Sequence, residues 1–83
     1  MKKFKLAGCT WEVVETEMLY LGSTNPDECR ILINKKLTKQ DRDVTFYHEL
    51  VHAIMFTMGE RDQDERFVEG FAQLLYQYEQ QKV

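Results

Sequence analysis

The sequence has little of what marks several large classes of protein. It contains one proline and four glycines, and only two of its 83 residues are cysteine. This composition excludes a low-complexity or collagen-like chain and a disulfide-rich secreted scaffold. No apolar run approaches the length of a transmembrane helix. The formal net charge of −3 offers no electrostatic basis for binding nucleic acid, so we expect neither a membrane nor a nucleic acid partner.

The two cysteines, Cys9 and Cys29, are expected to be free, buried thiols of a cytoplasmic protein. They lie far apart in the sequence and lack the short spacing of redox or metal-binding cysteine pairs. Residues 6–9 superficially match the processing site of a bacterial lipoprotein. The segment before them, however, lacks the apolar run of about seven residues that a secretory signal requires. We therefore expect a cytoplasmic location.

Length and hydrophobic pattern indicate a single α+β domain over residues 1–83. Apolar residues that alternate with polar ones predict a β-hairpin over residues 3–17, with its turn at Gly8 and Cys9. Residues 21–27 are rich in turn-forming types and are expected to form a loop. The β-branched residues within 29–33 predict a third strand. The sheet is therefore expected to be short, antiparallel and three-stranded.

Two packed helices are predicted to follow the sheet. Thr38 resembles an N-cap and Gly59 is a natural C-terminal stop, so the first helix is expected to span residues 38–58. Asp62 is the expected cap of a second helix that runs to about residue 80. The apolar residues of this second helix form one predicted stripe that packs against the first: Phe67, Val68, Phe71, Leu74, Leu75 and Tyr78.

Both histidines of the chain fall within the sequence His48-Glu49-Leu50-Val51-His52. Residues four apart lie on the same face of a helix, so two imidazoles in this spacing can reach one metal ion. The intervening Glu49 is placed to take a proton from water at the open coordination position of a catalytic zinc ion. The alternative interpretation is a pair of histidines that are simply packed and hydrogen-bonded in the core.

A catalytic zinc site needs a third protein ligand, and the sequence contains no further histidine. The second helix offers Glu65 and Glu69, which lie one turn apart on one face, beside its apolar stripe. A helical hairpin that turns back after Gly59 would bring either carboxylate towards the imidazoles. The spacing alone leaves the choice between the two glutamates open.

At these positions the chain resembles the zincin metallopeptidases of the gluzincin type. Residues 48–54 are similar to their HExxH helix, and residues 65–75 are similar to the glutamate-bearing helix that follows it. Within this group the chain is most similar to the ImmA/IrrE-type intracellular proteases and to very small zincin-like proteins of phages and prophages. The resemblance covers roughly residues 40–78, and the hairpin before them carries no specific motif.

The resemblance implies two alternative sets of ligands. In the ImmA/IrrE-type pattern Glu65 binds zinc and Glu69 accepts a hydrogen bond from a metal-bound histidine, although that family usually has Asn or Asp at the latter position. In the aminopeptidase-type pattern Glu69 is the ligand, and only Gln73 remains as an acceptor. A hairpin symmetric about residues 60–61 favours the second pattern, because it pairs Glu69 with His52. We favour Glu65, because metal-bound histidines normally have such an acceptor.

The resemblance implies a zinc-dependent metallopeptidase that hydrolyses peptide bonds of a protein or peptide substrate, with Glu49 as general base. In zincins the strand before the metal helix pairs with an extended substrate, and residues 29–33 would be that strand here. Without a spare histidine to stabilise the oxyanion, Tyr47, Tyr76 and Tyr78 are the candidates, although packing explains each of them more simply. Two alternatives remain: a non-catalytic interaction module stabilised by zinc, and a metal-free helical adaptor.

Overall fold

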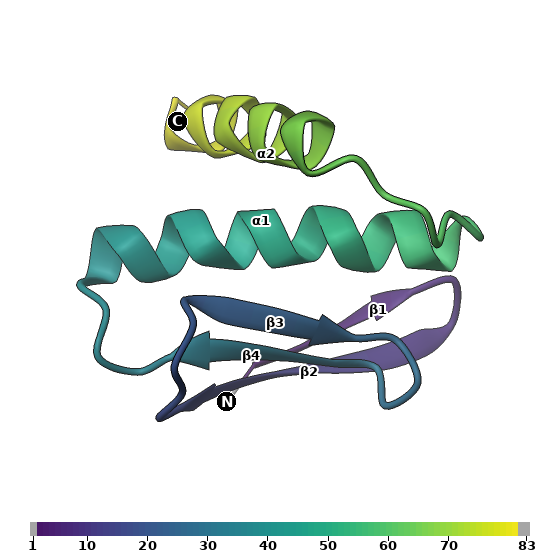
Figure 1. Ribbon diagram of the computed structural model, residues 1–83, viewed down its shortest axis with the longest axis horizontal. Helices are drawn as coiled ribbons and strands as arrows, with labels where there is room; N and C mark the ends of the chain where they lie inside the picture. The colour runs from purple at the N-terminus through teal and green to yellow at the C-terminus, as the bar shows by residue number, and fades with distance from the viewer. Residues whose placement is uncertain (1, 82–83) are drawn as a thin grey trace.

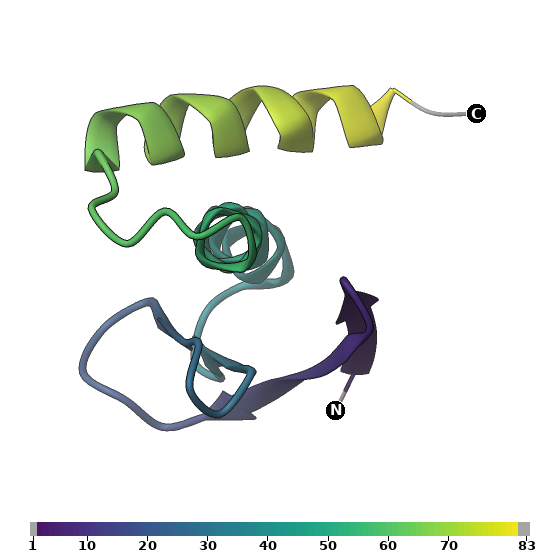
Figure 2. The same ribbon diagram turned by 90° about the vertical axis from the view of Figure 1, so that its right-hand side faces the viewer.

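Four strands and two helices form three layers, with one helix between the sheet and the other helix (Figures 1 and 2). The computed structural model describes residues 2–81. In chain order the elements are β1 (Lys2–Leu6), β2 (Cys9–Thr16), β3 (Gly22–Asn25), β4 (Arg30–Asn34), α1 (Lys39–Thr57) and α2 (Glu65–Gln80). The α+β class is thus as predicted. Neither of the two helices within the described residues is long and apolar enough to cross a bilayer.

The sheet differs from the three-stranded antiparallel sheet that the sequence predicts. It has four strands in the order β1-β2-β4-β3, and it is mixed because β2 and β4 run parallel to each other. The additional strand, β3, lies within residues 21–27, where the composition predicts a loop. The sequence of β3 is polar and carries no alternating hydrophobic signal. It forms a strand because β4 supplies an antiparallel partner for its backbone.

β4 begins at Arg30, one residue later than predicted, and is paired with β2 on one side and with β3 on the other. The expectation that residues 29–33 form the edge of a substrate cleft is therefore wrong. The free edges of the described sheet belong to β1 and β3, and β3 is the edge strand that packs against α1.

The predicted hairpin is present, with its turn one residue earlier than expected. β1 and β2 pair as far as Leu6 opposite Cys9, so the connecting loop consists of Ala7 and Gly8. Both loop residues have positive φ, 50° and 83°. This is typical of a two-residue type I′ turn, whose twist matches that of the flanking strands.

The two cysteines lie near each other and line one shallow depression of the surface. Both are free, as predicted, but neither is buried as predicted: Cys9 is exposed because it flanks the turn of the hairpin, and Cys29 is only partly buried. Burial raises the pKa of the Cys29 thiol, and the neighbouring Cys9 thiol acts in the same direction.

Two hydrophobic clusters hold the three layers together. The larger cluster, between the sheet and α1, consists of Trp11, Val13, Ile31, Ile33 and Ala53. Its strand residues alternate along the chain, so they all point to the face that α1 covers. The smaller cluster lies between the helices and consists of Val51, Val68 and Ala72. Burying an aliphatic side chain stabilises a fold by about 1.5–3 kcal/mol, so the sheet–helix cluster contributes the larger share.

Local signals set both ends of α1. The side chain of Thr38 accepts a hydrogen bond from the backbone N–H of Asp41 at 3.2 Å, so Thr38 is the predicted N-cap. Gly59 follows the helix with a φ of 91°, a left-handed conformation that only glycine adopts without strain. α1 therefore begins and ends within one residue of the predicted bounds.

α2 begins later than the sequence predicts. Its N-cap is Asp64, whose side chain accepts from the backbone N–H of Arg66 at 2.9 Å, and the expected cap Asp62 lies in the link before it. The link stays non-helical as far as Gln63, whose side chain contacts His52 of α1 and the carbonyl oxygen of Glu60. The start of α2 is thus marked by a local cap at Asp64, directly after a residue that contacts α1.

The apolar stripe predicted for α2 is divided between two surfaces. Val68, Ala72 and Leu75 pack towards α1. The remaining large residues are exposed: Phe67, Phe71, Leu74 and Tyr78. The prediction that the whole stripe packs against α1 is wrong, because α2 crosses a single helix and so covers only a narrow face.

We predict that Gly22→Ala destabilises the fold. A Cβ atom at this position would lie 2.8 Å from Cγ2 of Thr45 and 2.9 Å from the carbonyl oxygen of Leu32, so β3 would have to move away from α1. Overpacking of this kind costs about 1–3 kcal/mol. Urea denaturation measures the change in the free energy of unfolding.

Gly70→Ala is the matched control, because a Cβ atom there meets nothing within 4 Å. Gly70 lies inside α2, where alanine is favoured over glycine by about 0.5–1 kcal/mol, so this variant should be slightly more stable than the parent. Equal stability of the Gly22→Ala variant and the parent would contradict the close contact between β3 and α1.

Candidate metal centre

His48 and His52 lie on the face of α1 that points towards α2. Their helical spacing places the two rings side by side, with centroids 5.1 Å apart. Both side chains are partly buried, and the Nε2 atom of each is directed at the first turn of α2. The arrangement brings two imidazole nitrogens to one small volume between the helices.

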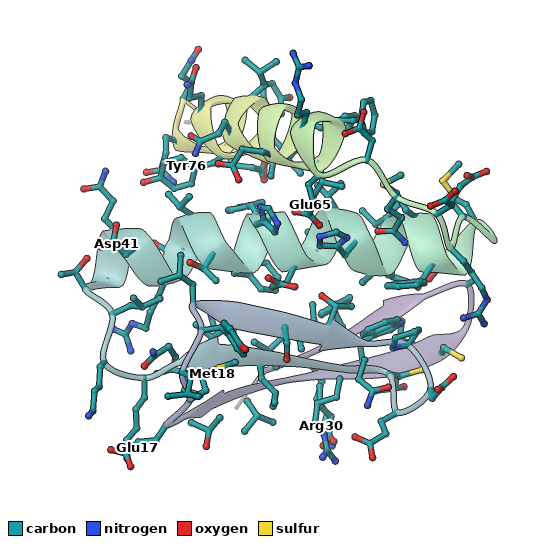
Figure 3. All side chains as sticks on the ribbon, viewed as in Figure 1. Glu17, Met18, Arg30, Asp41, Glu65 and Tyr76 are labelled. Atoms are coloured by element: carbon teal, nitrogen blue, oxygen red, sulfur yellow. The ribbon has the colours of Figure 1, made fainter. Side chains whose placement is uncertain are left out.

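Glu65, the first residue of α2, lies in the space between the helices (Figure 3). There it faces both imidazoles. Its Oε2 atom is 3.3 Å from Nε2 of His48, and its Oε1 atom is 2.9 Å from Nε2 of His52. One ligand atom from each of these three residues lies within 4.8 Å of the other two. Within residues 2–81, this is the group of side chains that could share a metal ion.

The second nitrogen of each ring faces a hydrogen-bond acceptor. Oε2 of Glu69 lies 3.0 Å from Nδ1 of His48, and Oε1 of Gln63 lies 2.5 Å from Nδ1 of His52. The Gln63 amide nitrogen donates to the carbonyl oxygen of Glu60, which determines the orientation of the amide. Gln63 is a residue that sequence reasoning missed, because a glutamine in a polar link carries no recognisable signal.

The hydrogen-bond pattern fits a cation between the imidazoles and Glu65. Carboxylate and amide oxygens only accept hydrogen bonds, so each Nδ1 carries the hydrogen. A neutral imidazole in that form directs the lone pair of its Nε2 at the carboxylate of Glu65. The Nε2 lone pairs and the negatively charged carboxylate repel one another unless protons or a shared cation lie between them. Two imidazole nitrogens and a carboxylate form a donor set typical of catalytic zinc.

Glu49 points towards β3 and is only 7% exposed. Its Oε1 atom accepts a hydrogen bond from the Thr24 hydroxyl at 2.6 Å, and the same hydroxyl lies 3.1 Å from the backbone carbonyl oxygen of Glu49. Thr24 therefore holds the carboxylate against the edge of the sheet. Sequence reasoning missed Thr24, because it belongs to the segment that the composition predicts to be a loop.

A cavity of about 210 Å³ is lined by Glu49 and by His48, one of the two histidines of the cluster. His48 and Glu69 contribute to its wall on the helix side, and Gly22 contributes from β3. Glu49 and His48 are neighbours in the sequence whose side chains meet the same open space. A small molecule in the cavity could therefore contact the carboxylate and the imidazole together.

The three tyrosines considered for oxyanion stabilisation lie elsewhere. Tyr47 and Tyr76 pack edge to face, with ring centroids 5.9 Å apart, and Tyr78 is largely exposed. None of the three is among the described residues that line the cavity. The surroundings of Tyr47 and Tyr76 indicate a role in packing.

No protein-family model matches the chain, and no curated protein or solved structure matches it. The functional argument therefore depends on the residues of the site and on their geometry.

Zinc affinity should separate the roles of the two glutamates. We expect Glu69→Gln to weaken zinc binding by about 10–100-fold, because the charge that orients the His48 ring is lost. Glu65→Gln should cause a larger loss, because it removes the anionic group next to both Nε2 atoms. Titration of the metal-free protein with zinc against a competing chelator measures both affinities.

Glu28→Gln is the control for the loss of one negative charge, because Glu28 is exposed and lies outside the cluster. A weaker effect of Glu65→Gln than of Glu69→Gln would identify Glu69 as the ligand and contradict the assignment made here.

Proposed function

We propose that the chain is a small zinc-dependent metallopeptidase with a zincin-like domain, similar to the ImmA/IrrE-type proteases and to the small zincin-like proteins of phages. One observation carries the proposal: the Nε2 atoms of His48 and His52 converge on the carboxylate of Glu65, while each Nδ1 faces an acceptor. The resemblance of residues 48–54 and 65–75 to the metal-binding helices of gluzincins supports it. We further propose a cytoplasmic location and a protein or peptide substrate.

The ligands in this proposal are His48, His52 and Glu65. Glu69 and Gln63 would fix the two rings through their Nδ1 hydrogens and make the imidazoles better ligands. A bound zinc ion would polarise the carbonyl group of the substrate and lower the pKa of water towards neutrality.

Glu49 would act as the general base. Its carboxylate would accept a proton from the attacking water and return it to the leaving amine. The Thr24 hydroxyl engages Oε1, which leaves Oε2 of Glu49 for proton transfer. Burial of this carboxylate in the cavity wall would keep bulk water from competing for the proton.

We propose that β3 takes the substrate-binding role that the sequence suggests for β4. Its outer edge has no partner strand among the described residues, and an extended peptide could pair with that edge. Gly22 lines the cavity and Thr24 contacts Glu49, so a peptide bound along β3 would pass close to both the general base and the metal ligands.

A zinc-stabilised interaction module without catalytic activity is the second candidate. It is favoured by the double contact between Thr24 and Glu49, which can be read as a purely structural connection between β3 and α1. In that case Glu49 would contribute to stability alone, and the metal would serve to join α1 and α2.

Glu49→Gln distinguishes the two candidates. The substitution keeps the size of the side chain and its contact with Thr24, so the variant should bind zinc as the parent does. It removes the proton acceptor, so hydrolysis of a peptide library should fall by at least about 100-fold. Elemental analysis measures the zinc content, and mass spectrometry of the digest measures cleavage.

Glu12→Gln is the control. Glu12 lies on β2 outside the cavity, where it forms an ion pair with Arg30 of β4. Cleavage by the Glu49→Gln variant at the rate of the parent would contradict a hydrolytic role for this residue. Addition of a chelator should abolish cleavage by the parent, since the proposed reaction requires the metal.

A further inference from the structure

The segment before β3 exposes a run of large apolar side chains. We call residues 18–21, which have the sequence Met-Leu-Tyr-Leu, the rim loop. The exposed fractions of Leu19, Tyr20 and Leu21 are 95%, 72% and 61%. Three consecutive apolar residues at this exposure are unfavourable in water, and contiguous apolar surface of this kind commonly marks a binding site.

Asn34 holds the rim loop in place through three hydrogen bonds. The side-chain amide of Asn34 donates to the carbonyl oxygens of Met18 and Tyr20, at 3.1 and 3.0 Å. The backbone N–H of Asn34 donates to the carbonyl oxygen of Leu21 at 2.9 Å. Because its backbone is bound at three points, the loop presents its side chains to solvent without having to be ordered by a partner.

The rim loop is continuous with the cavity beside His48. Leu21 belongs to the loop and also lines the cavity that contains His48 and Glu49. Figure 3 shows Met18 at the end of the sheet where β3 begins, so the loop leads directly into the strand that borders the cavity. Val44 and Ala72 add further apolar surface to the lining of the cavity, beside its polar residues.

We propose that the rim loop and the cavity together recognise an apolar segment of a polypeptide substrate. A large aliphatic or aromatic side chain of that segment would enter the cavity beside His48, and the residue next to it would pack on Leu19 and Tyr20. Asn34 is the positioning residue of this surface, because it holds the loop without touching the substrate. The proposal rests on the proposed function of the site.

A polypeptide is favoured over a membrane as the occupant. Peripheral membrane binding usually needs a cluster of basic residues near the apolar anchor, whereas the net charge of this chain is −3 and Lys36, which lies beside the rim loop, is paired with Glu17. A polypeptide is also favoured over a second copy of the chain, because a dimer through the rim loop would close the entrance to the cavity. A peptide along β3 uses the loop, the strand edge and the cavity at once.

Binding of two fluorescent octapeptides tests the proposal. The peptides differ only at three central positions, which are leucine in one and serine in the other. The full chain carrying Glu49→Gln and loaded with zinc should bind the leucine peptide at least about tenfold more tightly. Leu19→Ser combined with Tyr20→Ser should abolish that preference. Asn34→Asp, which removes both side-chain donors, should weaken binding of the leucine peptide by about fivefold.

The matched control combines Met58→Ser with Leu74→Ser, two apolar residues whose exposed fractions, 73% and 68%, are comparable but which lie outside the cavity wall. This control should bind the leucine peptide as the parent does. Equal binding of the two peptides, or an equal loss in the control and in the rim-loop variant, would overturn the proposal. So would binding of the rim loop to neutral phosphatidylcholine vesicles, or a dimer that the rim-loop substitutions dissociate.

The result of this binding experiment can be distinguished from the result of the cleavage experiment that tests the proposed function. Failure of the proposed function appears as absence of cleavage by the zinc-loaded parent. Failure of the present proposal appears as loss of the difference between the two peptides, which is measured without any cleavage. If the parent cleaves the peptide library but shows no enrichment of apolar residues next to the cleaved bond, the proposed function stands and the inference about substrate class is wrong.

Discussion

The contact between Val51 of α1 and the pair Val68 and Ala72 of α2 determines where the candidate site forms. These three residues make up the buried cluster between the helices. Glu65 and Glu69 each stand three residues before one member of that pair, so they lie on the adjoining flank of α2. The rotation that buries Val68 and Ala72 therefore turns both carboxylates towards the histidines. A few apolar contacts thus set the position of the polar groups.

The link between the helices explains why hairpin symmetry is a poor guide to the metal ligand. The backbone N–H of Glu60 donates to the carbonyl oxygen of Met55 at 2.8 Å, and Gln63 reaches back to His52. The chain therefore runs back along the end of α1 before α2 starts. As a result Glu65 faces both Nε2 atoms, whereas Glu69 faces the Nδ1 atom of His48. A tight symmetric turn would have placed Glu69 opposite His52.

Features that depend on neighbouring residues could be predicted from the sequence, whereas those that depend on distant contacts could not. The cap at Thr38 and the stop at Gly59 are local, and both are found where the sequence predicts them. β3 is a strand only because β4 pairs with it and α1 lies against it, and its residues have no intrinsic preference for that structure. Gln63 contacts His52, 11 positions away, and Thr24 contacts Glu49, 25 positions away. A local sequence pattern cannot predict contacts between residues so far apart.

The fold and the site depend on the same contacts. α2 is held to α1 by a cluster of only three buried residues, while several carboxylates gather at its first turns. Glu65 and Glu69 lie on one side of the histidines, and their mutual repulsion opposes the packing that Val68 and Ala72 favour. A divalent cation would replace this repulsion with attraction between the helices, because it would be shared by His48 on one helix and Glu65 on the other. Its binding free energy would then add directly to the stability of the helix pair, so that in this small domain the proposed catalytic ion would also hold the fold together.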